Sequence, residues 1–232
     1  MTVDARGETL EQYKRDAALA AVAAEVRDGM VVGLGTGSTA AYAVREIGRR
    51  MRQDGWRIEG VPTSERTAAL ARECGIPLIS LDAAPDVVLD GADQVDPSLT
   101  LIKGGGGAHA REKIVATAAR RTAIVADHTK EVDRLAGPVP LEVLPFAAAW
   151  VARALGERIS AASVRPRMSG GRAVMSDNGN VVLELMCGPI PDAASLAVLL
   201  DGTPGVVEHG LFVGIANVAY VAGPQGIKVR KI

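Results

Sequence analysis

The pattern of apolar and polar positions divides residues 1–126 into helices that alternate with short apolar strands. Helical spacing and stop signals predict helices over 10–27, 38–51, 64–74 and 109–121, and short apolar runs predict strands at 30–34, 56–61, 86–89 and 122–126. Strands alternating with helices form right-handed crossover units and a mostly parallel sheet. We therefore expect an α/β fold in which a Rossmann-like sheet is flanked by helices.

The pattern changes character at residues 137–140, where the sequence GPVP clusters proline and glycine as at a domain border. Beyond it the pattern predicts helices over 146–155 and 193–200, strand-like pieces between them, and a strand over 181–185 that follows the turn sequence SDNGN. This order predicts a second, smaller α+β domain of ferredoxin-like type over 137–205. Residues 206–232 are expected to return to the first domain, which then comprises 1–136 plus 206–232.

Composition narrows the class of protein. Of 232 residues, 48% are hydrophobic and 3% aromatic, and the net charge of −1 offers no broad basic field for nucleic acid. Cys74 and Cys187 lack metal-type spacing and the three histidines are scattered, so we expect no metal site and no cofactor. The N-terminal sequence has no apolar signal region, and the apolar runs are too short to span a membrane. We expect a cytoplasmic protein.

Polar residues gather directly after three of the predicted strands, in GLGTGSTA (33–40), DGADQVD (90–96) and ADHTK (126–130). Ligands of open parallel sheets bind outside the carboxyl ends of the strands. The residues expected to line one such crevice are Thr36, Ser38, Thr39, Asp90, Asp93 and Lys130. The two aspartates could equally be turn or cap residues in a solvated loop.

The loop GTGST suits a phosphate group, because its glycines let backbone N–H groups approach an anion at the start of a helix. Two other interpretations remain open. Gly35-x-Gly37-x-x-Ala40, with Glu59 about 20 residues further on, fits the loose dinucleotide fingerprint. A plain strand–helix turn that needs small residues would also fit.

Glu112 stands out in the helix expected over 108–120. At helical spacing Ala108, Glu112, Val115 and Ala119 share one stripe, so this glutamate is the only charge in an apolar row. An inward carboxylate must be paired, hydrogen-bonded or shifted in pKa, and such groups are often functional. If the helix is rotated instead, Glu112 pairs at the rim with Arg111 or another cation.

The stretch LIKGGGGAHAREK (101–113) places four glycines between a lysine and the Glu112 helix. Glycine gives up more backbone freedom on folding than any other residue, so the run requires a reason. Lys103 before it can reach a substrate oxygen, or it is a solvated lysine at a strand end. Lys14 and Lys130 carry the same ambiguity.

Taken together, these segments resemble ribose-5-phosphate isomerases of the A type, in the family's order and over nearly the whole chain. The matching motifs are GLGTGSTA (33–40), TSERT (63–67), DGADQVDP (90–97), KGGGGAHAREKI (103–114), ADHTK (126–130), PLEVLPFA (140–147), SDNGNVVLEL (176–185) and GVVEHGLF (205–212). The resemblance implies metal-independent interconversion of D-ribose 5-phosphate and D-ribulose 5-phosphate, in the non-oxidative pentose phosphate pathway. It also implies a homodimer or homotetramer, with no nucleic acid and no membrane as partner.

By the family's pattern, Glu112 would be the base that moves a proton between C1 and C2. Asp90 would assist ring opening or handle hydroxyl protons, with Asp93 beside it, and Lys103 would stabilise the enediolate oxygen. The residues implied to bind substrate are Thr36, Gly37, Ser38, Thr39, Asp90, Gly91, Ala92, Asp93, Lys103, Gly104, Gly105, Gly106, Lys130 and Lys14. Glycine at 104–107 would let the main chain touch a small polyol.

Four positions depart from the family's pattern: Gln94 stands where glutamate is usual, Gly107 where alanine is common, and His109 and Ala110 where bulkier residues are common. At helical spacing His109 is near Glu112 and could tune it. Two other functions compete with the isomerase. A sugar-phosphate sensor would bind without turnover, and a nicotinamide-dependent dehydrogenase would need a hydride-transfer site that the chain after Lys130 does not supply.

Overall fold

The structure is a computed structural model that describes residues 9–160 and 162–232. The chain forms two compact units. The first unit contains the chain up to Ala92, together with Arg111–Glu131 and Gly214–Ile232, and the second contains Asp93–Ala110 and Val132–Val213. The expected domains had placed 93–110, 132–136 and 206–213 with the first part of the chain. That division concerns independently folding domains and stays a prediction.

The first unit is built on a six-stranded sheet in the order β15-β14-β6-β3-β1-β2. Its strands are β1 (Val31–Leu34), β2 (Glu59–Pro62), β3 (Val87–Asp90), β6 (Thr122–Asp127), β14 (Val218–Gly223) and β15 (Gly226–Lys231). All neighbours pair in parallel except β14 and β15, which form an antiparallel hairpin at the edge. The predicted α/β class with a mostly parallel sheet is confirmed, and the order reverses between β1 and β3, where such sheets bind ligands.

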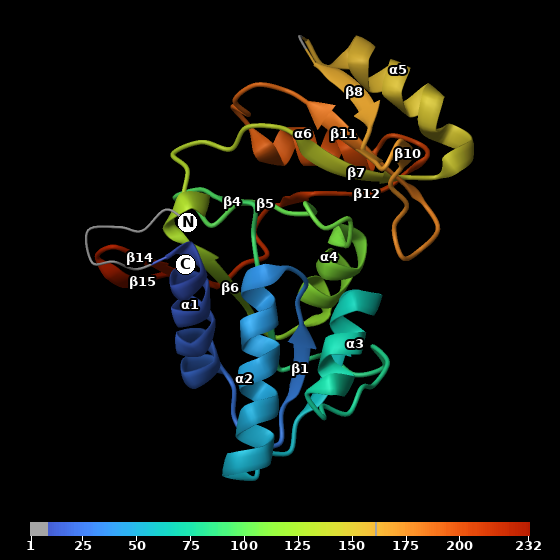
Figure 1. The fold of residues 1–232 in the computed structure, drawn as a ribbon. Helices are drawn as coiled ribbons and strands as arrows, with labels where there is room; N and C mark the ends of the chain where they lie inside the picture. The colour runs from blue at the N-terminus through green and yellow to red at the C-terminus, as the bar shows by residue number, and fades with distance from the viewer. Residues whose placement is uncertain (1–8, 161) are drawn as a thin grey trace. The chain divides into compact units, whose positions relative to one another are not determined.

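Helices cover both faces of this sheet. They are α1 (Leu10–Glu25), α2 (Ser38–Asp54), α3 (Glu65–Glu73) and α4 (His109–Ala118), and a 3-10 turn, η1 (His128–Lys130), follows β6. The core on one face joins α1 and α2 to alternate residues of the central strands, and the two helices lie side by side over the sheet in Figure 1. On the other face Val115 of α4 packs with Val61 and Val88.

Close packing on that second face depends on Gly33 in the middle of β1. A Cβ at this position would lie 2.4 Å from Val88 and 3.0 Å from Val115. The glycine therefore lets α4 approach the sheet closely, and this fixes the helix that carries Glu112.

The second unit contains a four-stranded antiparallel sheet in the order β12-β7-β11-β8. Its elements in chain order are β7 (Val139–Val143), η2 (Pro145–Ala147), α5 (Ala148–Arg158), β8 (Ser163–Pro166), β11 (Val181–Met186), α6 (Ala193–Asp201) and β12 (Val206–His209). This β-α-β-β-α-β order is that of the ferredoxin-like motif, as the sequence predicts. Valine and leucine side chains of the sheet form one core with α5 and α6.

Two smaller sheets complete the second unit. One is the hairpin of β9 (Met168–Ser169) and β10 (Arg172–Ala173), and the other is the three-stranded sheet β13-β5-β4, made of β4 (Gln94–Val95), β5 (Leu101–Ile102) and β13 (Leu211–Phe212). The strands β4, β5 and β15 were not predicted from the sequence, and β7 begins inside the GPVP stretch. With two residues each, β4 and β5 carry too little periodicity to be recognised.

Among residues 9–160 and 162–232, no helix combines the length and the apolar character needed to cross a bilayer.

Candidate functional site

Asp90 lies at the carboxyl end of β3, beside the loop that follows β1. Its Oδ1 atom accepts hydrogen bonds from the backbone N–H of Thr36, at 3.0 Å, and of Gly91, at 2.7 Å, and the side chain is 1% exposed. A Cβ at residue 35 would lie 2.3 Å from this oxygen, so the close approach requires Gly35. The structure thus brings the GTGST and DGAD motifs together at the reversal of strand order.

The hydroxyl of Thr36 is directed into a buried cluster formed with the TSERT motif. Its Oγ1 lies 2.8 Å from Thr63 Oγ1, 2.8 Å from Ser64 Oγ and 3.1 Å from Thr67 Oγ1. A hydroxyl has one proton, and Thr36 donates it to Ser64, while the oxygens of Thr63 and Thr67 enclose the hydroxyl on its other sides. Thr67 and Thr63 in turn donate to the carbonyl groups of Gly35 and Leu34. Thr36 therefore fixes the loop, a role that the sequence analysis did not foresee.

The rest of the GTGST loop leads into the long helix α2. Gly37 is the N-cap residue, with φ at 116° and no side-chain hydrogen bond to the cap, and Ser38 begins the helix at an exposed position. Thr39 is half-buried. The first turn of a helix has backbone N–H groups without intrahelical partners, and these favour anions. Binding of a phosphate by Gly37, Ser38 and Thr39 stays a prediction.

Glu112 is in the first turn of α4 and is 3% exposed. Val115, one turn later, packs on the sheet, so the stripe identified in the sequence does face inward. The helix leads back to the start of β6, which places its first turn at the carboxyl edge of the parallel sheet. Arg111 forms an ion pair with Glu65, with Nη1 and Oε1 2.9 Å apart. The rotated-helix alternative is thereby excluded.

In the second unit, Lys103 and the glycine run form a tightly held turn. Lys103 is buried, and its Nζ lies 5.4 Å from the centroid of the Phe212 ring. Its backbone N–H donates to the carbonyl of Gly210. Gly104 has φ at 105°, a conformation that favours glycine, and a Cβ there would lie 2.7 Å from the buried His109 ring. The structure therefore excludes the alternative of a solvated lysine.

Asp93 and its neighbour Gln94 also act within the second unit. The Oδ2 of Asp93 accepts a hydrogen bond of 2.7 Å from the Gly105 N–H. The Gln94 side chain donates to the Ala136 carbonyl at 2.7 Å and accepts from the Ala136 N–H at 2.9 Å. An amide satisfies both backbone groups, whereas an ionised glutamate could only accept. This explains why glutamine suits position 94.

The two remaining lysines lie in the first unit. Lys14 in α1 pairs with Glu11, its Nζ 2.7 Å from Oε1. Lys130 is half-buried at the end of η1, directly after β6, where the sequence places it.

The dinucleotide interpretation is wrong about Glu59. This residue is exposed and begins β2, where it pairs with Val31 at the start of β1, while the glycine loop follows the end of β1 at Leu34. Three residues of strand, about 10 Å, separate the two edges. The carboxylate therefore cannot reach a ribose held at the loop.

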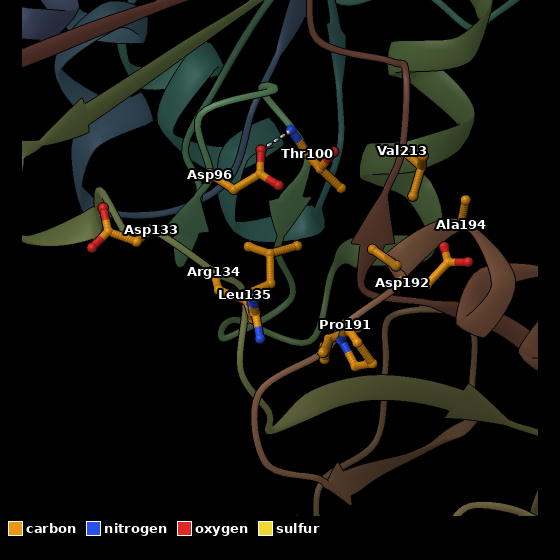
Figure 2. Close-up of a pocket in the computed structure, with 11 residues that line it drawn as sticks. Asp96, Thr100, Asp133, Arg134, Leu135, Pro191, Asp192, Ala194 and Val213 are labelled. Carbon is orange, nitrogen blue, oxygen red and sulfur yellow. Dashed lines mark hydrogen bonds between the residues drawn. The ribbon is translucent and has the colours of Figure 1, made fainter.

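The second unit contains a cavity of about 350 Å³. Figure 2 shows Asp96, Asp192, Arg134 and Pro191 around it. Asp96 accepts from the backbone of Ser98 and Thr100, and Asp192 caps α6. These carboxylates already serve local turns, and the cavity contains none of the predicted site residues.

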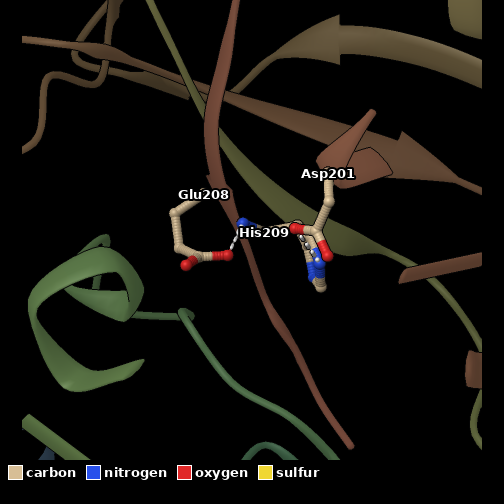
Figure 3. A group of neighbouring side chains, drawn as sticks. All are labelled: Asp201, Glu208 and His209. Atoms are coloured by element: carbon tan, nitrogen blue, oxygen red, sulfur yellow. Dashed lines mark hydrogen bonds and ion pairs between the residues drawn. The ribbon is translucent and has the colours of Figure 1, made fainter. Parts of the chain in front are cut away.

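One group of described side chains has metal-like proximity: Asp201, Glu208 and His209, drawn in Figure 3. The Nδ1 of His209 accepts from the Leu211 N–H, so its proton is on Nε2, which lies 3.1 Å from Asp201 Oδ1. Glu208 accepts from the His209 N–H. Backbone hydrogen bonds thus hold Glu208 and His209 in place, and the protonated Nε2 has no lone pair for a metal.

The chain matches the family model described as Ribose 5-phosphate isomerase A (phosphoriboisomerase A) over residues 59–226. Ribose-5-phosphate isomerase A of Nitrobacter hamburgensis is 50% identical over 229 residues, which cover 95% of this chain and 98% of the relative. Ribose-5-phosphate isomerase A of Chloroflexus aurantiacus is 49% identical over 226 residues, which cover 95% of this chain and 94% of the relative.

Solved structures agree with these sequence matches. Ribose 5-phosphate isomerase A of Methanocaldococcus jannaschii superposes with a TM-score of 0.91 at 40% identity, over 97% of this chain and 100% of that chain. A D-ribose-5-phosphate isomerase solved in complex with phospho-erythronic acid superposes with a TM-score of 0.92 at 38% identity, over the same shares.

Proposed function

Because the chain belongs to the ribose 5-phosphate isomerase A family, we propose that it interconverts D-ribose 5-phosphate and D-ribulose 5-phosphate without a metal. The resemblance seen in the sequence is confirmed, and the enzyme is an aldose–ketose isomerase. We place the reaction in the non-oxidative pentose phosphate pathway, in the cytoplasm, and propose a homodimer or homotetramer as the active form. The substrate is a small sugar phosphate.

Moving a proton between adjacent carbons through an enediolate requires one base that reaches both carbons. We assign this role to Glu112. A carboxylate in a partly dry pocket suits the task, because general bases work best with a pKa near the operating pH. Negative charge then develops on the sugar oxygens, and Lys103 supplies the cation that stabilises it. A preorganised donor of this kind lowers the barrier by roughly 3 kcal/mol.

Asp90 is assigned to ring opening and hydroxyl proton transfer. Two backbone N–H groups fix one of its oxygens, so the orientation of the carboxylate is set before substrate arrives. Asp93 supports the glycine turn by accepting a hydrogen bond from the Gly105 N–H. We assign it, like Asp90, to the hydroxyl groups of the substrate. The buried Lys103 and this turn supply the oxyanion contacts.

The phosphate end of the substrate is assigned to the start of α2, through Gly37, Ser38 and Thr39, with Lys130 and Lys14 as further cations. The hydroxyl of Thr36 is already bound by three protein oxygens, so its contribution is to hold the loop. The relative solved with phospho-erythronic acid supports a phosphate-bearing ligand for this family.

The burial of Glu112 is the observation that carries this proposal. A glutamate on a solvated face of a helix is exposed, whereas Glu112, in the first turn of α4, is only 3% exposed. A buried carboxylate must be paired, hydrogen-bonded or protonated, and acids held in this way are often functional.

The test is ketose formation from ribose 5-phosphate, with chelator and without nucleotide, by the wild type, Glu112→Gln and Glu65→Gln. Glu65 is an exposed glutamate of α3, which makes it a matched control. We expect Glu112→Gln to lose roughly 10³-fold in kcat while substrate binding stays within a few-fold. Glu65→Gln should behave as the wild type.

Three results would contradict the proposal. Tight phosphosugar binding without turnover by the wild type would favour the sensor. Dependence on nicotinamide would favour the dehydrogenase. A Glu112→Gln enzyme that kept most of its kcat would remove Glu112 from the role of base.

A further inference from the structure

Arg167, between β8 and β9, donates hydrogen bonds to the glycine turn from one side. Its Nη1 donates to the carbonyl of Gly104 at 2.8 Å and to that of Gly105 at 3.1 Å, and its Nε donates to Glu184 Oε1 at 3.0 Å. The backbone on both sides of this arginine is tied down, since its N–H donates to Val182 and its carbonyl accepts from Val174. The position and orientation of the guanidinium group are therefore fixed.

The carbonyls of Gly104 and Gly105, which accept from Arg167, belong to consecutive peptides of a β-turn. The turn spans Gly104–Gly107, closed by a hydrogen bond of 2.9 Å from the Gly107 N–H to the Gly104 carbonyl. Gly105 and Gly106 are its central residues, and neither has a positive φ, which is the type I arrangement. The Gly105 carbonyl belongs to the central peptide of that turn.

The central peptide of a turn with two glycines can flip at little cost, because glycine accepts the positive φ that the type II arrangement requires. A flip would reverse the Gly105 carbonyl and the Gly106 N–H together, since they lie on opposite sides of one planar trans peptide. Arg167 holds the carbonyl side. It therefore turns the Gly106 N–H to the opposite side of the loop.

That opposite side already carries an anion. The Gly105 N–H points there and binds the Asp93 carboxylate at 2.7 Å. Consecutive N–H groups on one side of a turn form a concave anion site. Resting on the proposed function, we propose that Arg167 is a positioning residue that locks this turn, so that the Gly106 N–H faces an oxyanion of the reacting sugar.

An arginine suits this task better than a lysine. The planar guanidinium reaches two carbonyls and one carboxylate at fixed angles, whereas an ammonium group is a point charge on a flexible stem. Glu184 contributes by setting the rotation of the guanidinium group through its hydrogen bond with Nε. Its side chain and that of Arg167 are 21% and 16% exposed, so the pair is largely shielded from solvent.

The test compares Arg167→Ala, Arg167→Lys and the matched control Arg165→Ala with the wild type. Arg165 is an exposed arginine two residues away on β8. Loss of one oxyanion donor costs about 10²–10³-fold in kcat. For partial misorientation we expect Arg167→Ala to lose about 10²-fold in kcat with KM within a few-fold. Arg167→Lys should recover part of the loss, Arg165→Ala should retain wild-type activity, and millimolar guanidinium, but not sodium, should rescue Arg167→Ala.

A second measurement reads the turn itself, through the ¹H–¹⁵N resonance and hydrogen exchange of the Gly106 amide. Arg167→Ala should change both, and Arg165→Ala should change neither. The proposed role of Arg167 is refuted if Arg167→Ala keeps kcat within twofold or leaves the Gly106 amide resonance and exchange unchanged. It is also refuted if Arg167→Ala loses the spectrum of a folded protein and guanidinium does not restore it. A wild type without turnover would refute the proposed function instead, and the Gly106 amide would then still decide whether Arg167 orients the turn.

Discussion

Replacing Gly35 with alanine tests whether the contact between the GTGST loop and Asp90 organises the candidate site residues of the first unit. The new Cβ would lie 2.3 Å from Asp90 Oδ1 and 2.5 Å from Asp90 Cα, whereas ordinary van der Waals contact begins at 3.4 Å. The second distance decides the outcome, because a backbone atom cannot rotate away as a flexible side chain can. One of the two segments must therefore move by about 1 Å.

That displacement has two measurable consequences. Overpacking of a tight interior costs roughly 1–3 kcal/mol in the free energy of unfolding. It also lengthens the hydrogen bond that the Thr36 N–H now gives to Asp90. A displacement of about 1 Å in a catalytic group can reduce activity roughly 10²-fold, which corresponds to about 2.7 kcal/mol of barrier.

The assay pairs urea denaturation with kcat/KM for ribose 5-phosphate. Gly156→Ala in α5 is the control, because nothing lies within 4 Å of the Cβ added there. Alanine is a better helix former than glycine, so the control should gain up to about 1 kcal/mol and keep full activity. A Gly35→Ala enzyme with wild-type kcat/KM and a free energy of unfolding within about 0.5 kcal/mol of the wild type would refute the reasoning.

Three further predictions concern residues outside the proposed catalytic set. Thr67→Val keeps the shape but removes a buried hydroxyl, and should lower the free energy of unfolding by about 1–3 kcal/mol in urea titrations. Gln94→Glu should cost a similar amount at neutral pH, because an ionised carboxylate cannot donate to the carbonyl now bound, and the loss should shrink as pH falls and the acid is protonated. Hydrogen bonds from Arg49 and Arg50 lower the pKa of Glu46 from 4.5 to about 2. The resulting stabilisation, about 2 kcal/mol after allowance for solvent screening, is present above pH 4.5 and is lost as pH falls towards 2. Acid titrations of stability should therefore be flatter for Glu46→Gln between pH 5 and 2, and identical curves would contradict the assignment.

Features with a local signal were predictable from the sequence. The inward direction of Glu112 follows from helical periodicity, since Val115 on the same stripe packs on the sheet. The start of α3 follows from Ser64 at its boundary, whereas α2 continues to Asp54, just before Gly55, and so beyond the predicted end at residue 51. The convergence of Thr36 and Asp90 follows from the rule that ligands bind at strand ends in parallel sheets.

Features that depend on distant partners were not predictable. Nothing near Arg167 in the sequence indicates that it binds carbonyls of residues 104 and 105. The TSERT motif matched the family, but its purpose emerges only when Thr63, Ser64 and Thr67 surround one hydroxyl. Likewise, glutamine at 94 is explained by the backbone of Ala136, which lies 42 residues away.

Both glycine loops show the same physical arrangement. Glycine permits a close approach or an unusual backbone conformation, but it also leaves the loop free to adopt others, and ordering each residue costs roughly 1–2 kcal/mol in backbone entropy. In the GTGST loop the opposing contribution comes from a buried hydroxyl cluster and the Asp90 carboxylate. In the turn after Lys103 it comes from Arg167 and the Asp93 carboxylate. Hydrogen bonds to charged groups stabilise by about 1.5–3 kcal/mol each, enough to select one conformation of a short turn. It follows that substitutions at Arg167 and Asp93 should impair activity before they impair folding, because each removes a preference among conformations of the turn rather than part of a core.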